Sequence, residues 1–156
     1  MDKNELMLYQ MHHQDPVNKF LHFVCIPIIS YSILVSFSKY QLKIIDLSSQ
    51  KIKVNMCFDE LIVLFYNVYY LTYGMKIGFY MFIYNTFLYT ISRAIYSHYP
   101  TNDKQNFMVF LAAFTLQFIG HYIEGSRPAM FVGLKQTLLQ APLFNLNYIY
   151  PNLLNN

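Results

Sequence analysis

Long apolar runs, separated by short polar connectors, dominate the chain. The run Phe20–Phe37 contains no formally charged residue. Just before it, Asp15-Pro16 is typical of a helix start, with a carboxylate at the N-cap and proline at the first helical position. At about 1.5 Å of rise per residue, this run is close in length to the thickness of a hydrocarbon core. The pattern therefore predicts a first membrane span here.

A second long run, Leu61–Ile95, carries only Lys76 and Arg93 as charged residues. One helix over the whole run would be roughly 50 Å long, which is too long for a single crossing. The segment YGMKIG in its middle places Gly74 and Gly78 on either side of Lys76, and glycines are typical of turns. We therefore expect two short spans that form a helical hairpin.

Polar segments flank these runs. Residues 38–55 mix charges with serine and asparagine and are expected to form an exposed connector, and residues 97–106 form the next one. The run Phe107–Glu124 predicts a fourth helix. Gly125 immediately after it and Pro128 shortly beyond are the expected stop signals.

The two ends of the chain are less regular. Residues 3–14 fit a short amphipathic helix, and residues 130–150 are apolar but interrupted by Gly133, Lys135 and Pro142, which fits a helix at the membrane interface or a partial span. The pattern predicts an all-α fold: one helical membrane domain over residues 1–156, with about four spans. A soluble all-helical protein with an oily core stays open, because the runs are short and rich in tyrosine and asparagine.

Composition favours the membrane reading. Hydrophobic residues make up 55% of the chain and charged residues 12%, whereas a soluble domain carries about 25% charged residues to wet its surface. The net charge is only +3, and the lysines are scattered through the connectors. Without a basic stripe, nucleic acid is not an expected partner, whereas membrane lipid is.

The end of the fourth predicted helix carries a candidate metal-binding pair. His121 and Glu124 are three residues apart, and Gln117 lies on the same helical face. Helical bundles use such an i, i+3 pair to present a nitrogen and a carboxylate to one metal ion. Ionisable groups next to lipid are costly and usually face the bundle interior. The alternative is a helix end at the aqueous boundary, where both side chains are solvated.

The start of the first predicted helix carries a second candidate group. Asn18 and His22 share one helical face, whereas His13 precedes the helix and can approach His22 only if the chain before Asp15 folds back. Arg127 can either hold a substrate carboxylate through its guanidinium or anchor a helix end.

Taken together, these stretches resemble the 2-hydroxy-fatty-acid dioxygenase family, whose founding member is named for the metabolism of phytosphingosine to odd-numbered fatty acids. The resemblance rests on two motifs and on LLQAPLF, residues 138–144. The motifs are His13-x-x-Pro16-x-Asn18-Lys19-x-x-His22-x-x-x-x-Pro27 and Gln117-Phe118-Ile119-Gly120-His121-x-x-Glu124-Gly125-x-x-Pro128-Ala129. Between these segments the chain matches only as apolar helices, and Cys25 stands where a glycine is expected.

The resemblance implies a multi-pass protein of the endoplasmic reticulum and an Fe(II)-dependent enzyme. Its substrates would be O2 and a 2-hydroxy fatty acid, which it would shorten by one carbon. The matched positions imply His13, His22 and His121 as iron ligands, with Glu124 as a fourth ligand or as a partner that orients His121. Asn18 or Arg127 would hold the substrate carboxylate.

Two other functions stay open from the residues. One is a non-enzymatic membrane protein that binds lipid or a partner helix, in which the polar side chains stabilise the bundle. The other is a zinc hydrolase on the same scaffold, because imidazole and carboxylate also suit zinc.

Overall fold

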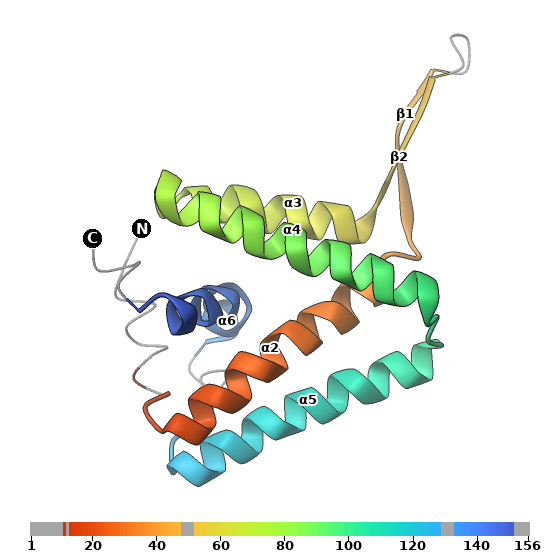
Figure 1. Ribbon diagram of the computed structural model, residues 1–156. Helices are drawn as coiled ribbons and strands as arrows, with labels where there is room; N and C mark the ends of the chain where they lie inside the picture. Colours follow the sequence, from red (N-terminus) through yellow and green to blue (C-terminus); the bar gives the residue numbers. More distant parts are fainter. Residues whose placement is uncertain (1–10, 12, 48–51, 129–132, 152–156) are drawn as a thin grey trace.

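The computed structural model describes residue 11 and residues 13–47, 52–128 and 133–151, with the backbone alone in 43–47, 52–54 and 134–136. This part of the chain forms a bundle of five helices and one β-hairpin (Figure 1). In chain order the elements are α2 (Pro16–Phe37), β1 (Gln41–Leu47), β2 (Ile52–Cys57), α3 (Phe58–Leu71), α4 (Met75–His98), α5 (Asp103–Glu124) and α6 (Leu134–Ile149). The predicted helical bundle is confirmed, whereas the predicted helix over residues 3–14 lies almost entirely outside the described residues.

Helices α2 and α5 lie side by side in opposite directions along the lower part of Figure 1. The side chain of Asp15 caps α2 by accepting hydrogen bonds from the backbone N–H groups of Val17 and Asn18, as Asp15-Pro16 predicts. At the other end of the pair, Gly125 ends α5 in the left-handed conformation, with φ of 70°. The local signals at these helix ends therefore bring the start of α2 next to the end of α5.

Helices α3 and α4 form the predicted hairpin, and the turn lies at Gly74, whose φ is 111°. Gly78 is not part of this turn. It lies in the first turn of α4, where a Cβ would overlap the side chain of Leu71, so its small size lets the two helices pack closely. An ion pair of 2.9 Å between Arg93 and the buried Asp59 joins the other end of the hairpin.

The predicted connector of residues 38–55 is wrong in part, because β1 and β2 pair there as an antiparallel hairpin that projects away from the bundle (Figure 1). The sequence IKVNMC of β2 alternates apolar and polar residues, which is the period of a strand. The charged and polar positions that suggest a solvated connector are thus the polar half of a strand pattern.

Helix α6 is continuous through Pro142, although the sequence predicts an interruption there. Proline has no N–H, so Pro142 leaves the carbonyl of Leu138 without its helical donor, as Pro27 does for the carbonyl of Phe23 in α2. Other helices supply these donors: the Tyr66 hydroxyl lies 2.9 Å from the Leu138 oxygen. The Asn145 amide lies 3.1 Å from the Phe23 oxygen. These bonds dock α6 against α3 and α2.

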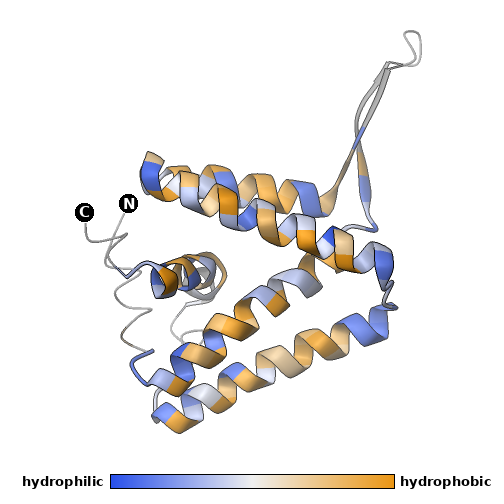
Figure 2. Cartoon of the chain, viewed as in Figure 1, coloured by the Kyte–Doolittle hydropathy of each residue, from blue (hydrophilic) through white to orange (hydrophobic). Residues whose placement is uncertain are grey.

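Two helices, α2 and α5, are long and apolar enough to cross a membrane by length and composition. Only 33% and 22% of their most apolar windows are buried inside the protein, whereas a core helix of a soluble protein is mostly buried. Apolar positions also cover outward faces of the bundle (Figure 2). These observations indicate membrane association, and the arrangement of about four spans stays a prediction.

We predict that Asn145→Leu lowers the free energy of unfolding by about 1–3 kcal/mol, because it leaves the Phe23 carbonyl buried without a donor. Denaturant unfolding in detergent measures this change. Asn147→Leu, a partly buried position on the same helix, is the matched control. Equal effects of the two substitutions would contradict the role given to the Asn145 amide.

Candidate metal centre

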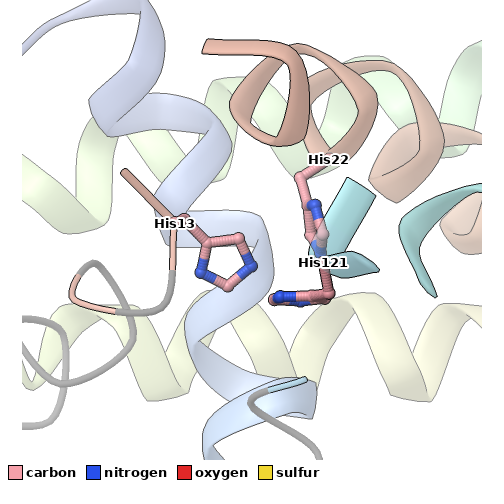
Figure 3. A group of neighbouring side chains, drawn as sticks. All are labelled: His13, His22 and His121. Atoms are coloured by element: carbon pink, nitrogen blue, oxygen red, sulfur yellow. The ribbon is translucent and has the colours of Figure 1, made fainter. Parts of the chain in front are cut away.

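Three buried histidines from distant parts of the chain meet beside the start of α2 (Figure 3). His13 comes from the segment before α2, His22 from α2 and His121 from α5, and their exposed fractions are 1%, 3% and 4%. The ring centroids of His13 and His22 are 4.2 Å apart, and each lies less than 5 Å from that of His121. The chain before Asp15 therefore does fold back, which is the condition that the sequence sets for His13 to approach His22.

Glu124 holds this fold-back in place. Its Oε1 accepts hydrogen bonds from the backbone N–H groups of Gln14 and, at 3.0 Å, of Asp15. Its Oε2 accepts from the Asn18 side-chain amide and, at 3.1 Å, from the Ser126 hydroxyl. With both oxygens engaged by such donors, the carboxylate lies beside the histidine cluster and fixes the backbone that carries His13.

Hydrogen bonds also determine the protonated nitrogen of two imidazoles. Nδ1 of His22 lies 3.0 Å from the carbonyl oxygen of Asn18, which can only accept, so Nδ1 carries the proton. The Ser126 hydroxyl donates to Glu124, so we assign its 3.1 Å contact with Nδ1 of His121 as a bond that Nδ1 donates; the Asn18 amide, 3.4 Å from the same Nδ1, then donates to Glu124 instead. In both neutral rings Nε2 is then the nitrogen that can coordinate a metal.

The close approach of α2 and α5 depends on Gly120. A Cβ at this position would overlap Oδ1 of Asn18 and would lie 3.3 Å from the Asn18 Cα. Asn18 is itself fully buried, and its amide lies 3.4 Å from Nδ1 of His121. The absence of a side chain at position 120 thus places one residue of α2 between Glu124 and His121.

The three histidines fit a metal ion. Each offers one ligand nitrogen, and these nitrogens lie within 4.8 Å of one another. Metal–imidazole bonds are about 2.1 Å long, so ligands of one ion lie within about 4 Å of each other, which is close to the observed spacing. The donor set suits iron, zinc, copper or nickel.

Comparison with known proteins agrees with this geometry. The family model described as 2-hydroxy-palmitic acid dioxygenase Mpo1-like matches residues 3–153, which includes all three histidines. The chain belongs to this family. It is also 29% identical over 144 residues to the 2-hydroxy-palmitic acid dioxygenase MPO1 of Saccharomyces cerevisiae, which covers 91% of this chain and 75% of the yeast protein. No solved structure matches the chain.

Two residues at this site were not predicted from the sequence. Ser126 links His121 to Glu124, and the ring of Phe144 lies 5.1 Å from that of His13 and 6.5 Å from that of His22. Both belong to stretches that carry the family resemblance, which is the signal that could have revealed them. Arg127, which the sequence offers as a residue that could hold the substrate carboxylate, is exposed in the segment after α5.

We predict that Gly120→Ala lowers the free energy of unfolding by about 1–3 kcal/mol through overlap with Asn18. Denaturant unfolding in detergent checks this in a double-mutant cycle with Asn18→Ala, which removes the overlapping amide. The cost of Gly120→Ala should be smaller in the Asn18→Ala background. The same cost in both backgrounds would show that the close approach to Asn18 is not its cause.

Proposed function

We propose that this protein is an Fe(II)-dependent dioxygenase that converts a 2-hydroxy fatty acid to the fatty acid one carbon shorter and CO2. The cluster of His13, His22 and His121 in a chain of this family carries the proposal. The relative that matches is named for 2-hydroxy-palmitic acid, which gives the substrate class. The reaction R–CHOH–COOH + O2 → R–COOH + CO2 + H2O balances without a further reductant.

The metal supplies redox chemistry with O2 when it is bound, and imidazole ligands with open positions suit non-haem Fe(II). His22 and His121 would coordinate through Nε2, because their Nδ1 atoms donate to Asn18 and Ser126. His13 would complete the set from the folded-back segment. The dioxygenase name of the family, rather than the donor set, favours iron over zinc in this proposal.

The surrounding residues orient these ligands. Glu124 fixes His13 through the backbone at residues 14 and 15, and it fixes His121 through Ser126. We therefore assign Glu124 the positioning role rather than that of a fourth ligand. Asn18 is fully buried against Glu124 and His121, which favours positioning for it also. For the substrate carboxylate, Arg127 is the candidate, since its exposed guanidinium follows Ser126 closely in the chain.

The site is proposed to take its substrate from a membrane. A fatty acid partitions into lipid, and the two helices that support His22 and His121 are the ones among the described residues that are both long and apolar enough to span it. The family resemblance extends this proposal to a multi-pass protein of the endoplasmic reticulum.

The first test of the proposal is turnover of 2-hydroxypalmitate by the detergent-purified protein with Fe(II) and O2. We expect pentadecanoate, detected by mass spectrometry, and its loss with a chelator or in His121→Ala. His98→Ala is the matched control, because His98 is exposed at the end of α4 and bonds the Ala94 carbonyl. It should keep full activity.

Two other results would contradict the proposal. Folded, iron-loaded protein that forms no product from 2-hydroxy acids would favour the non-enzymatic lipid-binding function. Hydrolysis of a fatty acyl ester by the zinc-loaded protein, with no oxidation of 2-hydroxy acids by the iron-loaded protein, would favour a hydrolase.

We further predict that Glu124→Gln weakens iron binding by about 10–100-fold, the usual effect of removing a group that orients metal ligands. An amide nitrogen in place of one carboxylate oxygen would face donors rather than acceptors at this position. Equilibrium competition with a chelator measures the affinity. Glu60→Gln is the matched control, because this carboxylate at the start of α3 also accepts a hydrogen bond from a backbone N–H group and has no part in the proposed site. Unchanged affinity in Glu124→Gln would remove the positioning role.

A further inference from the structure

A pocket of about 360 Å³ lies between all five helices, next to the histidine cluster. Its volume is within the range of small-molecule sites, roughly 300–1,000 Å³. Its lining is mainly aliphatic and aromatic, for example Ile29 and Ile33 of α2, Leu88 of α4, and Phe110 and Phe114 of α5.

Most polar side chains on the pocket wall already have partners. The Tyr66 hydroxyl bonds the Leu138 carbonyl, the Tyr84 hydroxyl lies 3.2 Å from the Asn145 amide, and Asn85 bonds Asn67 at 2.8 Å. An occupant with polar groups along its length would find few partners and would lose its own hydration. The pocket therefore selects a mainly apolar ligand.

Two residues of the pocket wall lie close to the histidines along the chain, and Phe144 lies between one of them and the histidine rings. Ile26 lies one helical turn beyond His22 in α2, and Gln117 lies one turn before His121 in α5. Phe144 contacts the rings of His13 and His22, and it packs against Ile26 in a small apolar cluster. A molecule in the pocket would thus begin within one helical turn of the proposed reaction centre.

The pocket also has a direction. Ile33 in α2 and Phe110 in α5 each lie eleven positions along the chain from the histidine of their own helix, which is about 16 Å along a helix. Tyr84 of α4 is linked to the His22 end of α2, because its hydroxyl lies 3.2 Å from the Asn145 amide, which also bonds the Phe23 carbonyl. Helix α4 runs in the same general direction as α2 (Figure 1), so we assign Leu88, one turn farther along α4, to the other end of the pocket. Ile33, Leu88 and Phe110 form the end of the pocket remote from the metal centre, which we call the remote end.

We propose that this pocket binds the acyl chain of the substrate, with Gln117 at its polar end and Ile33, Leu88 and Phe110 setting the chain length accepted. Gln117 lines the pocket one helical turn before His121, and an amide can hydrogen-bond the carboxyl or 2-hydroxyl group of a ligand that reaches that histidine. The proposal rests on the proposed function for the identity of the ligand. It adds where the acyl chain binds and which residues limit its length.

Photolabelling tests the location independently of turnover. The probe is palmitate with a diazirine at mid-chain, which lacks the 2-hydroxyl group, and cross-linked peptides are mapped by mass spectrometry on the full-length wild-type protein in detergent. We expect label within residues 26–34 and 110–117 that excess 2-hydroxypalmitate removes. Label confined to outward-facing positions such as Ile83, or label insensitive to competition, would overturn the proposal.

Substitution at the remote end tests the measuring role. Leu88→Trp fills this end, and we expect at least tenfold lower turnover of the longest accepted 2-hydroxy acid with little change for shorter ones, because each methylene that no longer fits costs about tenfold or more. Ile83→Trp is the matched control, an exposed aliphatic position on the same helix. Leu88→Ala enlarges this end and should extend the accepted length.

The two arms separate the failure of this proposal from that of the proposed function. Competed label in the pocket without turnover of any 2-hydroxy acid supports the chain site and contradicts the dioxygenase assignment. Thermal unfolding first shows whether Leu88→Trp and Leu88→Ala are folded. If both folded variants accept the same chain lengths as the wild type, the measuring role is overturned.

Discussion

The contact between Asn18 and Gly120 is the constraint on which the site depends. At this point α2 and α5 approach so closely that a single methyl group would not fit, and the approach puts His22 and His121 in reach of each other across about a hundred residues of chain. Because Asn18 is buried between the helices, its amide can reach Glu124, and Glu124 in turn holds the segment that carries His13. One close helix contact therefore supports the whole cluster.

Local signals made much of the fold predictable from the sequence. Asp15-Pro16, Gly74 and Gly125 mark helix boundaries through backbone preferences that act within a few residues, and the structure has boundaries at all three. The β-hairpin was missed because its polar half looks like a solvated connector. Helical spacing alone indicated His121 as a candidate ligand, whereas His13 and His22 were predicted as ligands only through the family resemblance. Two of the four donors to Glu124 are backbone N–H groups, which leave no signature in a sequence, and only folding shows where they point.

Because the chain is rich in tyrosine and asparagine, its sequence is also compatible with a soluble helical protein. In the structure these side chains have a different role. Tyr66 and Tyr70 of α3 donate to carbonyl oxygens of α6, and Asn106 of α5 donates to Ser32 and Ser36 of α2. Polar side chains thus join helices in the interior, while large apolar side chains remain on outward faces. This distribution is the one expected where lipid surrounds the bundle, because helix association there relies on hydrogen bonds and close packing. It also lowers the apparent hydropathy of α3 and α4.

The prolines inside α2 and α6 have a consequence for how the molecule assembles. Each breaks one hydrogen bond of its own helix, and the replacement donor comes from a helix far away in the chain: Asn145 for α2 and Tyr66 for α6. In a medium without water, neither helix is complete until its neighbour has arrived. Helix α6 therefore completes α2 although it is synthesised long after it, so that a ribosome-bound chain that ends before α6 holds an unfinished α2 and an unformed wall of the acyl pocket.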